Sequence, residues 1–471
     1  MTSFKKSVLS NHILIALFLL AGFGFSCRST EMVEAESIPK PALKEETELN
    51  GLEALVENSE VFKKTITGFE LFDPETEEVL YAVNEDKYMN PASNTKLFTF
   101  YAGKKLLGER IPAMKYVIKG DSLIFWGTGD PSFLHPDIGT MDVFNFLSEF
   151  DGDLFFSDSN YEDDHLGPGW SWADYNSYYS AEKSPMPIYG NIARMTIEHV
   201  ESYKLAEDEN GYKIRPKYLK KFIREDGLSE EGRFVLQRER EGNYFTYEFT
   251  SDTTVYETDK PFHYTPELFV ELLSDTLKKP VLYMPDVKLP ESAETLYSIE
   301  ADSLYKQLLQ PSDNMVAEHI LLMISSTIDG RLNSRKAIEF AKKELLTDLP
   351  DDANWRDGSG LSRYNLFTPR SMVALLDKID DAVDDDLLFD LLPQGGKAGT
   401  IRNWYGARDG GPTYIFAKTG TLSNNHCLSG YLITRSGKKL IFSFMNNNYV
   451  ISTNDVRIQM EEILWYIHEN Y

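Results

Sequence analysis

Strand-like sequence at both ends of the folded chain is the feature that most constrains the fold. Near the start, residues 65–71 and 78–83 alternate apolar and polar side chains, and the turn-forming segment 73–75 separates them. Near the end of the chain, three more runs have the same character: residues 413–417, 427–434 and 439–446. We therefore expect one antiparallel sheet that is built from both ends of the chain.

Helical periodicity predicts the layers that cover this sheet. Apolar residues recur at helical spacing in the runs 93–101, 304–325, 335–346, 369–379 and 455–466. Residues 116–295 differ, with short β-like runs, aromatic residues and Gly/Pro turns, and they predict inserted material with its own core. The sequence therefore indicates an α+β fold: an antiparallel sheet flanked by helices, with a large β-rich insertion.

Composition sets broad limits on the class of protein. The chain has 471 residues, enough for two or three domains, and its 42% hydrophobic content can supply a sizeable core. Its formal net charge is −26, and no segment gathers enough Lys and Arg to offset that charge locally. Such a chain repels phosphate backbones, so we expect no nucleic-acid partner.

The first 50 residues predict export and a tether. Lys5 and Lys6 precede an apolar run, 13–25, which is too short to span a membrane and ends beside Ser26 and Cys27. Residues 24–27 resemble a bacterial lipobox, so residues 1–26 are predicted to be a signal peptide and Cys27 to carry a lipid. Plain secretion and an uncleaved anchor are the alternatives.

Residues 27–50 follow as a flexible tether, because they are acidic, contain proline and lack aromatic side chains. The second cysteine, Cys427, is expected to be an unpaired, buried residue.

The first chemical motif is Ser93-x-x-Lys96 at the start of a predicted helix. The i,i+3 spacing puts the hydroxyl and the amine on one helix face, one turn apart. A serine hydroxyl is a poor nucleophile until a base takes its proton, and a lysine can do so once burial or a neighbouring cation lowers its pKa. By itself the pattern is common by chance on exposed helices.

Two more motifs follow along the chain, and each also has a purely structural interpretation. Ser312-Asp313-Asn314 opens the apolar helix 315–325 and could simply be an N-cap. Lys418-Thr419-Gly420-Thr421 lies in a predicted strand, where the lysine could bind a carboxylate and the glycine permits close backbone approach. The structural alternative is an exposed lysine on an edge strand.

The order S-x-x-K, S-D-N, K-T-G characterises penicillin-binding proteins and class A β-lactamases. From about Gly51 to its C-terminus the chain resembles the class C, low-molecular-mass penicillin-binding proteins, a family of D-alanyl-D-alanine carboxypeptidases and endopeptidases. Further segments carry the resemblance: 91–93 (PAS), 127–131 (GTGDP), 158–159 with 167–172 (DS, GPGWSW), 357–363 (DGSGLSR) and 392–400 (LPQGGKAGT).

The resemblance implies a role for each matching residue. Ser93 would be the acylated nucleophile, Lys96 its base and Ser312 a proton relay, while Asn314 would hold Lys96 and the substrate amide. Lys418, Thr419 and Thr421 would bind the terminal carboxylate, and the backbone N–H groups of Ser93 and Thr421 would form the oxyanion hole. Asp158 and Arg363 match positions that contact the peptide's side chain in some members.

Some positions depart from the family pattern or have a structural interpretation. Thr128 replaces a glycine of GGGDP, and residues 179–182 replace Y-x-A-P. Trp170 and Trp172 could be core aromatic residues, and residues 357–360 are expected to form a loop that holds the site walls. The eight histidines show no metal-ligand spacing, so no metal or cofactor is expected.

These observations predict a serine D,D-peptidase of the bacterial cell envelope that cleaves peptidoglycan peptides and is acylated by β-lactam antibiotics. The catalytic domain is predicted to comprise residues 51–115 and 296–471, and the inserted domain or domains residues 116–295. Membrane contact is expected only through the lipid. The alternatives are a β-lactamase and a catalytically silent peptidoglycan-binding lipoprotein. Carboxypeptidase and endopeptidase preference stay open.

Overall fold

The computed structural model describes residues 51–197, 212–228, 234–249 and 255–471. The predicted signal peptide, the tether and Cys27 lie outside these described residues.

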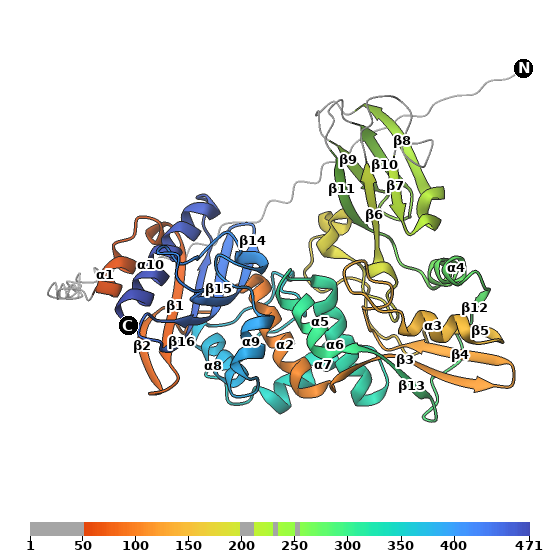
Figure 1. Ribbon diagram of the computed structural model, residues 1–471, viewed down its shortest axis with the longest axis horizontal. Coiled ribbons are helices and arrows are strands. Elements are labelled where there is room, and N and C mark those ends of the chain that lie inside the picture. Colours follow the sequence, from red (N-terminus) through yellow and green to blue (C-terminus); the bar gives the residue numbers. More distant parts are fainter. Residues whose placement is uncertain (1–50, 198–211, 229–233, 250–254) are drawn as a thin grey trace, which may run out of the picture. The chain divides into compact units, whose positions relative to one another are not determined.

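The first sheet is assembled from both ends of the chain, as the sequence predicts. Its strand order is β14 (Ile415–Leu422), β15 (Asn425–Ile433), β16 (Lys439–Asn447), β1 (Ile66–Asp73) and β2 (Glu78–Val83). Every neighbouring pair is antiparallel, and β1 runs beside β16 with Phe69 opposite Phe444 (Figure 1). Apart from Ile433 and Lys439, every residue of β15 and β16 is buried, because helices cover both faces of the sheet.

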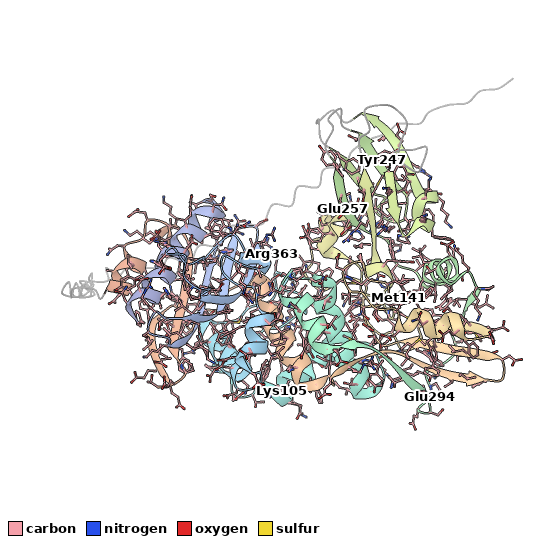
Figure 2. All side chains as sticks on the ribbon, in the orientation of Figure 1. Lys105, Met141, Tyr247, Glu257, Glu294 and Arg363 are labelled. Carbon is pink, nitrogen blue, oxygen red and sulfur yellow. The ribbon has the colours of Figure 1, made fainter. Side chains whose placement is uncertain are left out.

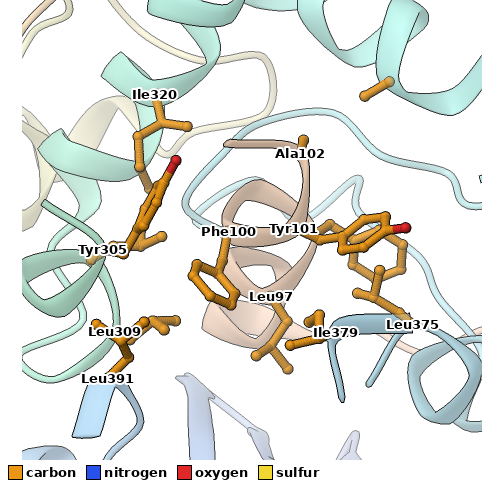
Figure 3. Packing of buried hydrophobic residues seen from close by; sticks show 14 of the residues in the cluster. Leu97, Phe100, Tyr101, Ala102, Tyr305, Leu309, Ile320, Leu375, Ile379 and Leu391 are labelled. Atoms are coloured by element: carbon orange, nitrogen blue, oxygen red, sulfur yellow. The ribbon is translucent and has the colours of Figure 1, made fainter. Parts of the chain in front are cut away.

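One face of this sheet packs against the terminal helices α1 (Gly51–Glu57) and α10 (Thr453–Asn470). The other face packs against α8 (Pro369–Asp380) and the central helix α2 (Thr95–Leu106). Helices α5 (Ala301–Leu309) and α6 (Asn314–Asp329) pack against α2. Helix α7 (Ser334–Leu345) packs against α6, and α9 (Asp385–Leu391) packs against α5. Figure 3 shows the core that α2 contributes to, with Phe100 against Tyr305 and Leu97 beside Ile379.

The predicted helical run 304–325 is interrupted in the structure. Helix α5 ends at Leu309 and α6 begins at Asn314. Pro311 lies in the gap, and Ser312 adopts a left-handed φ of 67°, so the backbone cannot continue as a helix. The S-D-N motif therefore lies on a turn that opens α6, and this turn directs its side chains.

The insertion has its own sheets and its own core. A mixed five-stranded sheet has the order β12 (Val281–Tyr283), β5 (Asp153–Ser157), β4 (Ser122–Gly127), β3 (Arg110–Lys119) and β13 (Glu294–Glu300). Helices α3 (Asp142–Glu149) and α4 (Pro266–Leu277) pack on it and share one apolar cluster with it. Along the chain, the sheet begins with β3 at Arg110 and ends with β13 at Glu300, a few residues beyond each predicted boundary of the insertion.

Two three-stranded sheets complete the insertion. One has the order β11 (Tyr256–Pro261), β6 (Ile192–Ile197) and β7 (Tyr212–Arg215). The other has the order β8 (Ile223–Leu228), β10 (Phe245–Phe249) and β9 (Val235–Arg238). None of the helices in the described part of the chain combines the length and the hydropathy that a membrane crossing requires.

Candidate active site

Ser93 lies at the point where the chain turns into the central helix. It is the middle residue of a short 3-10 turn, Ala92–Asn94, which leads directly into α2. The strand β14 passes so close to this turn that a Cβ on Gly420 would lie 2.2 Å from the Pro91 carbonyl oxygen. The glycine of K-T-G therefore permits the close approach that the sequence predicts, and it brings Lys418 and Thr421 to the serine.

Lys96 is fully buried one turn after Ser93. Its Nζ donates to Ser93 Oγ at 3.0 Å, to Asn314 Oδ1 at 2.6 Å and to the Ser359 carbonyl oxygen at 2.7 Å. Burial lowers the pKa of Lys96 to about 8, although the carboxylates of Asp357, Glu318 and Asp313 oppose the shift. The amine can therefore lose its proton near neutral pH while it contacts the serine hydroxyl.

The loop 357–360 fixes the carbonyl group that holds Lys96. The buried Asp357 carboxylate accepts the N–H groups of Gly360 at 2.9 Å and Ser362 at 2.6 Å. The loop thus holds the site, as the sequence predicts.

Glu318 on α6 accepts Ser359 N–H at 2.8 Å and Gly358 N–H at 3.1 Å, and burial raises its pKa to about 7. Glu318 was not among the residues predicted from the sequence. Its signal was a carboxylate inside an apolar helical run, four residues after Asn314.

The side chains of the S-D-N motif have two roles: one caps α6, and the other two contact the lysines of the site. Asp313 caps α6 by accepting Val316 N–H at 3.1 Å. Ser312 and Asn314 take no part in that cap: Ser312 Oγ lies 2.7 Å from Lys418 Nζ, and Asn314 binds Lys96. Asn314 also donates to the Tyr179 carbonyl oxygen at 2.8 Å, which connects the site to the insertion.

Lys418 is fully buried although β14 is an edge strand of its sheet. The alternative interpretation as an exposed edge lysine is therefore wrong. Its Nζ donates to Ser312 Oγ and, at 2.9 Å, to the Thr419 carbonyl oxygen. Burial and the neighbouring charge of Lys96 hold the pKa of Lys418 well below its usual range.

A cavity of about 900 Å³ lies in front of these groups. The two hydroxyls of K-T-G-T line it: Thr419 Oγ1 lies 2.8 Å from Thr400 Oγ1, and Thr421 Oγ1 lies 2.8 Å from His426 Nδ1. Four other residues that the sequence predicts for the site also line this cavity: Ser93, Ser312, Asn314 and Arg363. Arg363, labelled in Figure 2, donates to the Ser423 carbonyl oxygen at 3.1 Å.

The structure does not bring Asp158 to this cavity. Its carboxylate accepts the Tyr283 hydroxyl at 2.8 Å, on the β12 side of the insertion, and it is not among the lining residues. Trp170 donates to Asp357 at 2.8 Å and thereby braces the loop. Trp172 is 72% exposed, so the interpretation of this tryptophan as a core residue is wrong.

The hydrogen-bonded group of Ser93, the buried Lys96 and Asn314, on an α+β fold with an antiparallel sheet, defines a penicillin-binding, active-site serine hydrolase. The family model described as the D-Ala-D-Ala carboxypeptidase 3 (S13) family matches residues 49–466. The chain belongs to this family.

Two relatives match over most of their length. The D-alanyl-D-alanine carboxypeptidase DacB of Haemophilus influenzae is 23% identical over 422 residues, which are 80% of this chain and 84% of that protein. The D-alanyl-D-alanine carboxypeptidase of Actinomadura sp. is 26% identical over 444 residues, 84% of this chain and 80% of the relative.

Among solved structures, penicillin-binding protein 4 (dacB) of Haemophilus influenzae superposes with a TM-score of 0.69 at 20% identity, covering 88% of this chain and 98% of that one. The comparison confirms the predicted fold class, a penicillin-binding domain with a large insertion.

Proposed function

We propose that this chain is a serine D,D-peptidase that hydrolyses D-alanyl-D-alanine bonds of peptidoglycan peptides through an acyl-enzyme on Ser93. One observation carries the proposal: Lys96 Nζ lies 3.0 Å from Ser93 Oγ, and its pKa is near 8. A nucleophile within hydrogen-bond reach of a base that titrates near neutrality is what acyl transfer requires.

The proposed reaction begins with neutral Lys96. It takes the proton of Ser93 Oγ as that oxygen attacks the scissile carbonyl carbon. The negative charge that develops on the carbonyl oxygen is bound by the backbone N–H groups of Ser93 and Thr421, and each such donor contributes about 10²–10³ in rate.

Breakdown of this adduct breaks the C–N bond. The proton that Lys96 took from Ser93 passes to the leaving amine through Ser312, whose hydroxyl is already bonded to Lys418, and Lys96 is again neutral. Water then attacks the Ser93 ester with Lys96 as base, which releases the shortened peptide and returns the proton to the serine. Asn314 keeps Lys96 aligned in both steps.

Substrate recognition is proposed for the side of the cavity formed by β14. The Thr419 and Thr421 hydroxyls line the cavity and are proposed to bind the terminal carboxylate, together with Lys418, which is buried beside them on β14. Arg363 is proposed to contact the peptide's side chain, because it lines the same cavity. We do not extend this proposal to Asp158, which lies outside the cavity.

Intact-protein mass spectrometry after incubation with benzylpenicillin tests the assignment. We expect a stable adduct on Ser93, located by digestion, and none in Ser93→Ala. Ser423→Ala, which changes a serine at the rim of the same cavity, serves as the control and should still be acylated. Hydrolysed drug without an adduct would instead identify a β-lactamase, and intact drug without an adduct would identify a silent binding protein.

The family's substrate places this protein in the cell envelope. We further propose that Cys27 carries the lipid that anchors it there. In the full-length chain, Cys27→Ser should move the protein from the membrane fraction to the soluble fraction on centrifugation. Retention in the membrane fraction would contradict the lipid anchor and leave the proposed peptidase activity unaffected.

A further inference from the structure

Several polar groups without protein partners gather at the end of the catalytic cavity beyond Thr421. His426 on β15 and Arg457 on α10 line the cavity there, together with Trp404 and Tyr405. His426 Nε2 and the Tyr405 hydroxyl are both buried and have no hydrogen-bond partner in the described part of the chain. None of the predicted roles uses these residues.

The position of the proton on His426 follows from its surroundings. Burial, and then the charge of Arg457, lower its pKa to about 3, so the ring is neutral at physiological pH. A proton on Nε2 would leave a buried N–H donor without an acceptor, which is rarer and costlier in proteins than a bare acceptor. The proton therefore belongs on Nδ1, which lies 2.8 Å from Thr421 Oγ1.

This tautomer fixes the direction in which Thr421 donates. Its oxygen accepts the His426 Nδ1–H group, so its own hydrogen points elsewhere. Since Thr421 lines the cavity, the hydroxyl is available to donate to a bound anion.

Arg457 adds a positive charge at the same end. Across the described residues, its guanidinium has no carboxylate within 4.0 Å, and its Cζ lies 5.5 Å from the centroid of the Trp404 ring. Glu461, one helical turn further along α10, already accepts Tyr405 N–H at 2.6 Å. An arginine in a cavity without a protein partner is well suited to bind a carboxylate from a ligand.

We propose that His426 and Arg457 complete a carboxylate-binding subsite with Thr421, and that this subsite recognises the carboxylate on the leaving D-residue of the substrate. His426 is a positioning residue that orients the Thr421 hydroxyl, and Arg457 supplies the charge. The inference rests on the proposed function and deepens it, because it assigns two residues, His426 and Arg457, to recognition of the leaving D-residue.

The test uses two D-alanyl thioesters that differ only at the leaving group, one with a free carboxylate and one with the corresponding amide. Arg457→Gln should lower kcat/KM about tenfold for the carboxylate thioester and leave the amide thioester unchanged. Arg408→Gln is the matched control, because this arginine is paired with Glu462 at 2.8 Å and does not line the cavity.

Two variants test the positioning role. His426→Asn can still donate to Thr421 Oγ1 and should keep most of the preference for the carboxylate, whereas His426→Phe cannot donate and should lose it. Equal losses on both thioesters in Arg457→Gln, or an unchanged ratio, would overturn the subsite. A wild-type enzyme that forms no Ser93 adduct with benzylpenicillin would instead overturn the proposed function, so the two failures are distinguishable.

Discussion

Two buried lysines each contact a serine hydroxyl, Lys96 that of Ser93 and Lys418 that of Ser312, and their surroundings separate their roles. Lys96 has three carboxylates nearby, Asp357, Glu318 and Asp313, which oppose the desolvation that lowers its pKa. The pKa of Lys418 is lowered by burial and by the charge of Lys96, with no carboxylate among the causes. Lys96 is thus poised to exchange a proton near neutral pH, and it is the better candidate for the base.

The rate of acylation should therefore rise with pH through a value near 8. Lys96 is charged below its pKa and cannot accept the Ser93 proton, so only the fraction of enzyme with a neutral amine reacts. The rate of acylation by benzylpenicillin, measured between pH 6 and pH 9, should show this rise. A rate independent of pH over that range would exclude Lys96 as the base.

Among individual residues, those that belong to short motifs can be predicted from the sequence. Ser93 and Lys96 are one helical turn apart, so their contact follows from local geometry. The part played by Glu318 depends on α6 packing against the loop 357–360, which no local pattern encodes. The position of Asp158, bonded to Tyr283 of a distant strand, likewise depends on the packing of the insertion.

Among the elements, the loop 357–360 and the turn before α2 fit together with almost no spare room. Gly360 has a φ of +82°, and a Cβ there would lie 1.9 Å from the Ala92 carbonyl oxygen, beside the nucleophile. The loop also supplies the Ser359 carbonyl that holds Lys96. The conformation of this loop therefore sets the positions of Ser93 and Lys96, the proposed nucleophile and base.

Gly360→Ala should slow acylation by benzylpenicillin at least 100-fold, because the loop and the turn must move apart to accept a methyl group. Gly410→Ala is the matched control. Its φ is +74°, but no atom lies within 4 Å of the added Cβ, so it carries the backbone strain without the collision. Adduct formation by mass spectrometry and the midpoint of thermal unfolding would be compared. Equal effects in the two variants would show that strain alone is responsible.

The helices and strands that can be predicted from the sequence are those whose apolar residues recur at a regular spacing. The hairpin β1–β2, the helices α7 and α8 and the three C-terminal strands lie close to their predicted ranges. The apolar period of the run 304–325 does not reveal the break between α5 and α6, whereas the interpretation of residues 312–314 as an N-cap does predict that a helix begins there. There the left-handed backbone of Ser312 overrides the helical pattern.

In the whole molecule, hydrogen bonds at the active site connect the insertion to the rest of the fold. Trp170 of the insertion donates to Asp357, and Asn314 of the catalytic domain donates to Tyr179 of the insertion. These contacts reach the loop 357–360 and the residue that holds Lys96. The insertion thus supports the catalytic machinery as well as lining the cavity.

Trp170→Phe should lower the free energy of unfolding by about 1.5–3 kcal/mol, the usual contribution of a hydrogen bond to a charged group. Acylation should also slow, because Asp357 would lose one of its donors. Trp172→Phe, two residues away and 72% exposed, is the control and should leave both quantities unchanged. If chemical denaturation and adduct formation did not distinguish the two variants, the hydrogen bond from Trp170 to Asp357 would not connect the insertion to the active site.

The pairing of β1 with β16 also determines when activity can arise during synthesis. A chain that emerges from the ribosome carries Ser93 and Lys96 early, but β1 has only β2 as a neighbour until residue 447 is present. Lys418 and Thr421 arrive in the same last portion of the chain. Nearly the whole polypeptide must therefore be made, with one edge of β1 unpaired throughout, before any serine is reactive. We therefore expect a nascent or truncated chain that lacks these strands neither to cleave peptides nor to be acylated, and to expose the unpaired edge of β1 to aggregation until its final strands have formed.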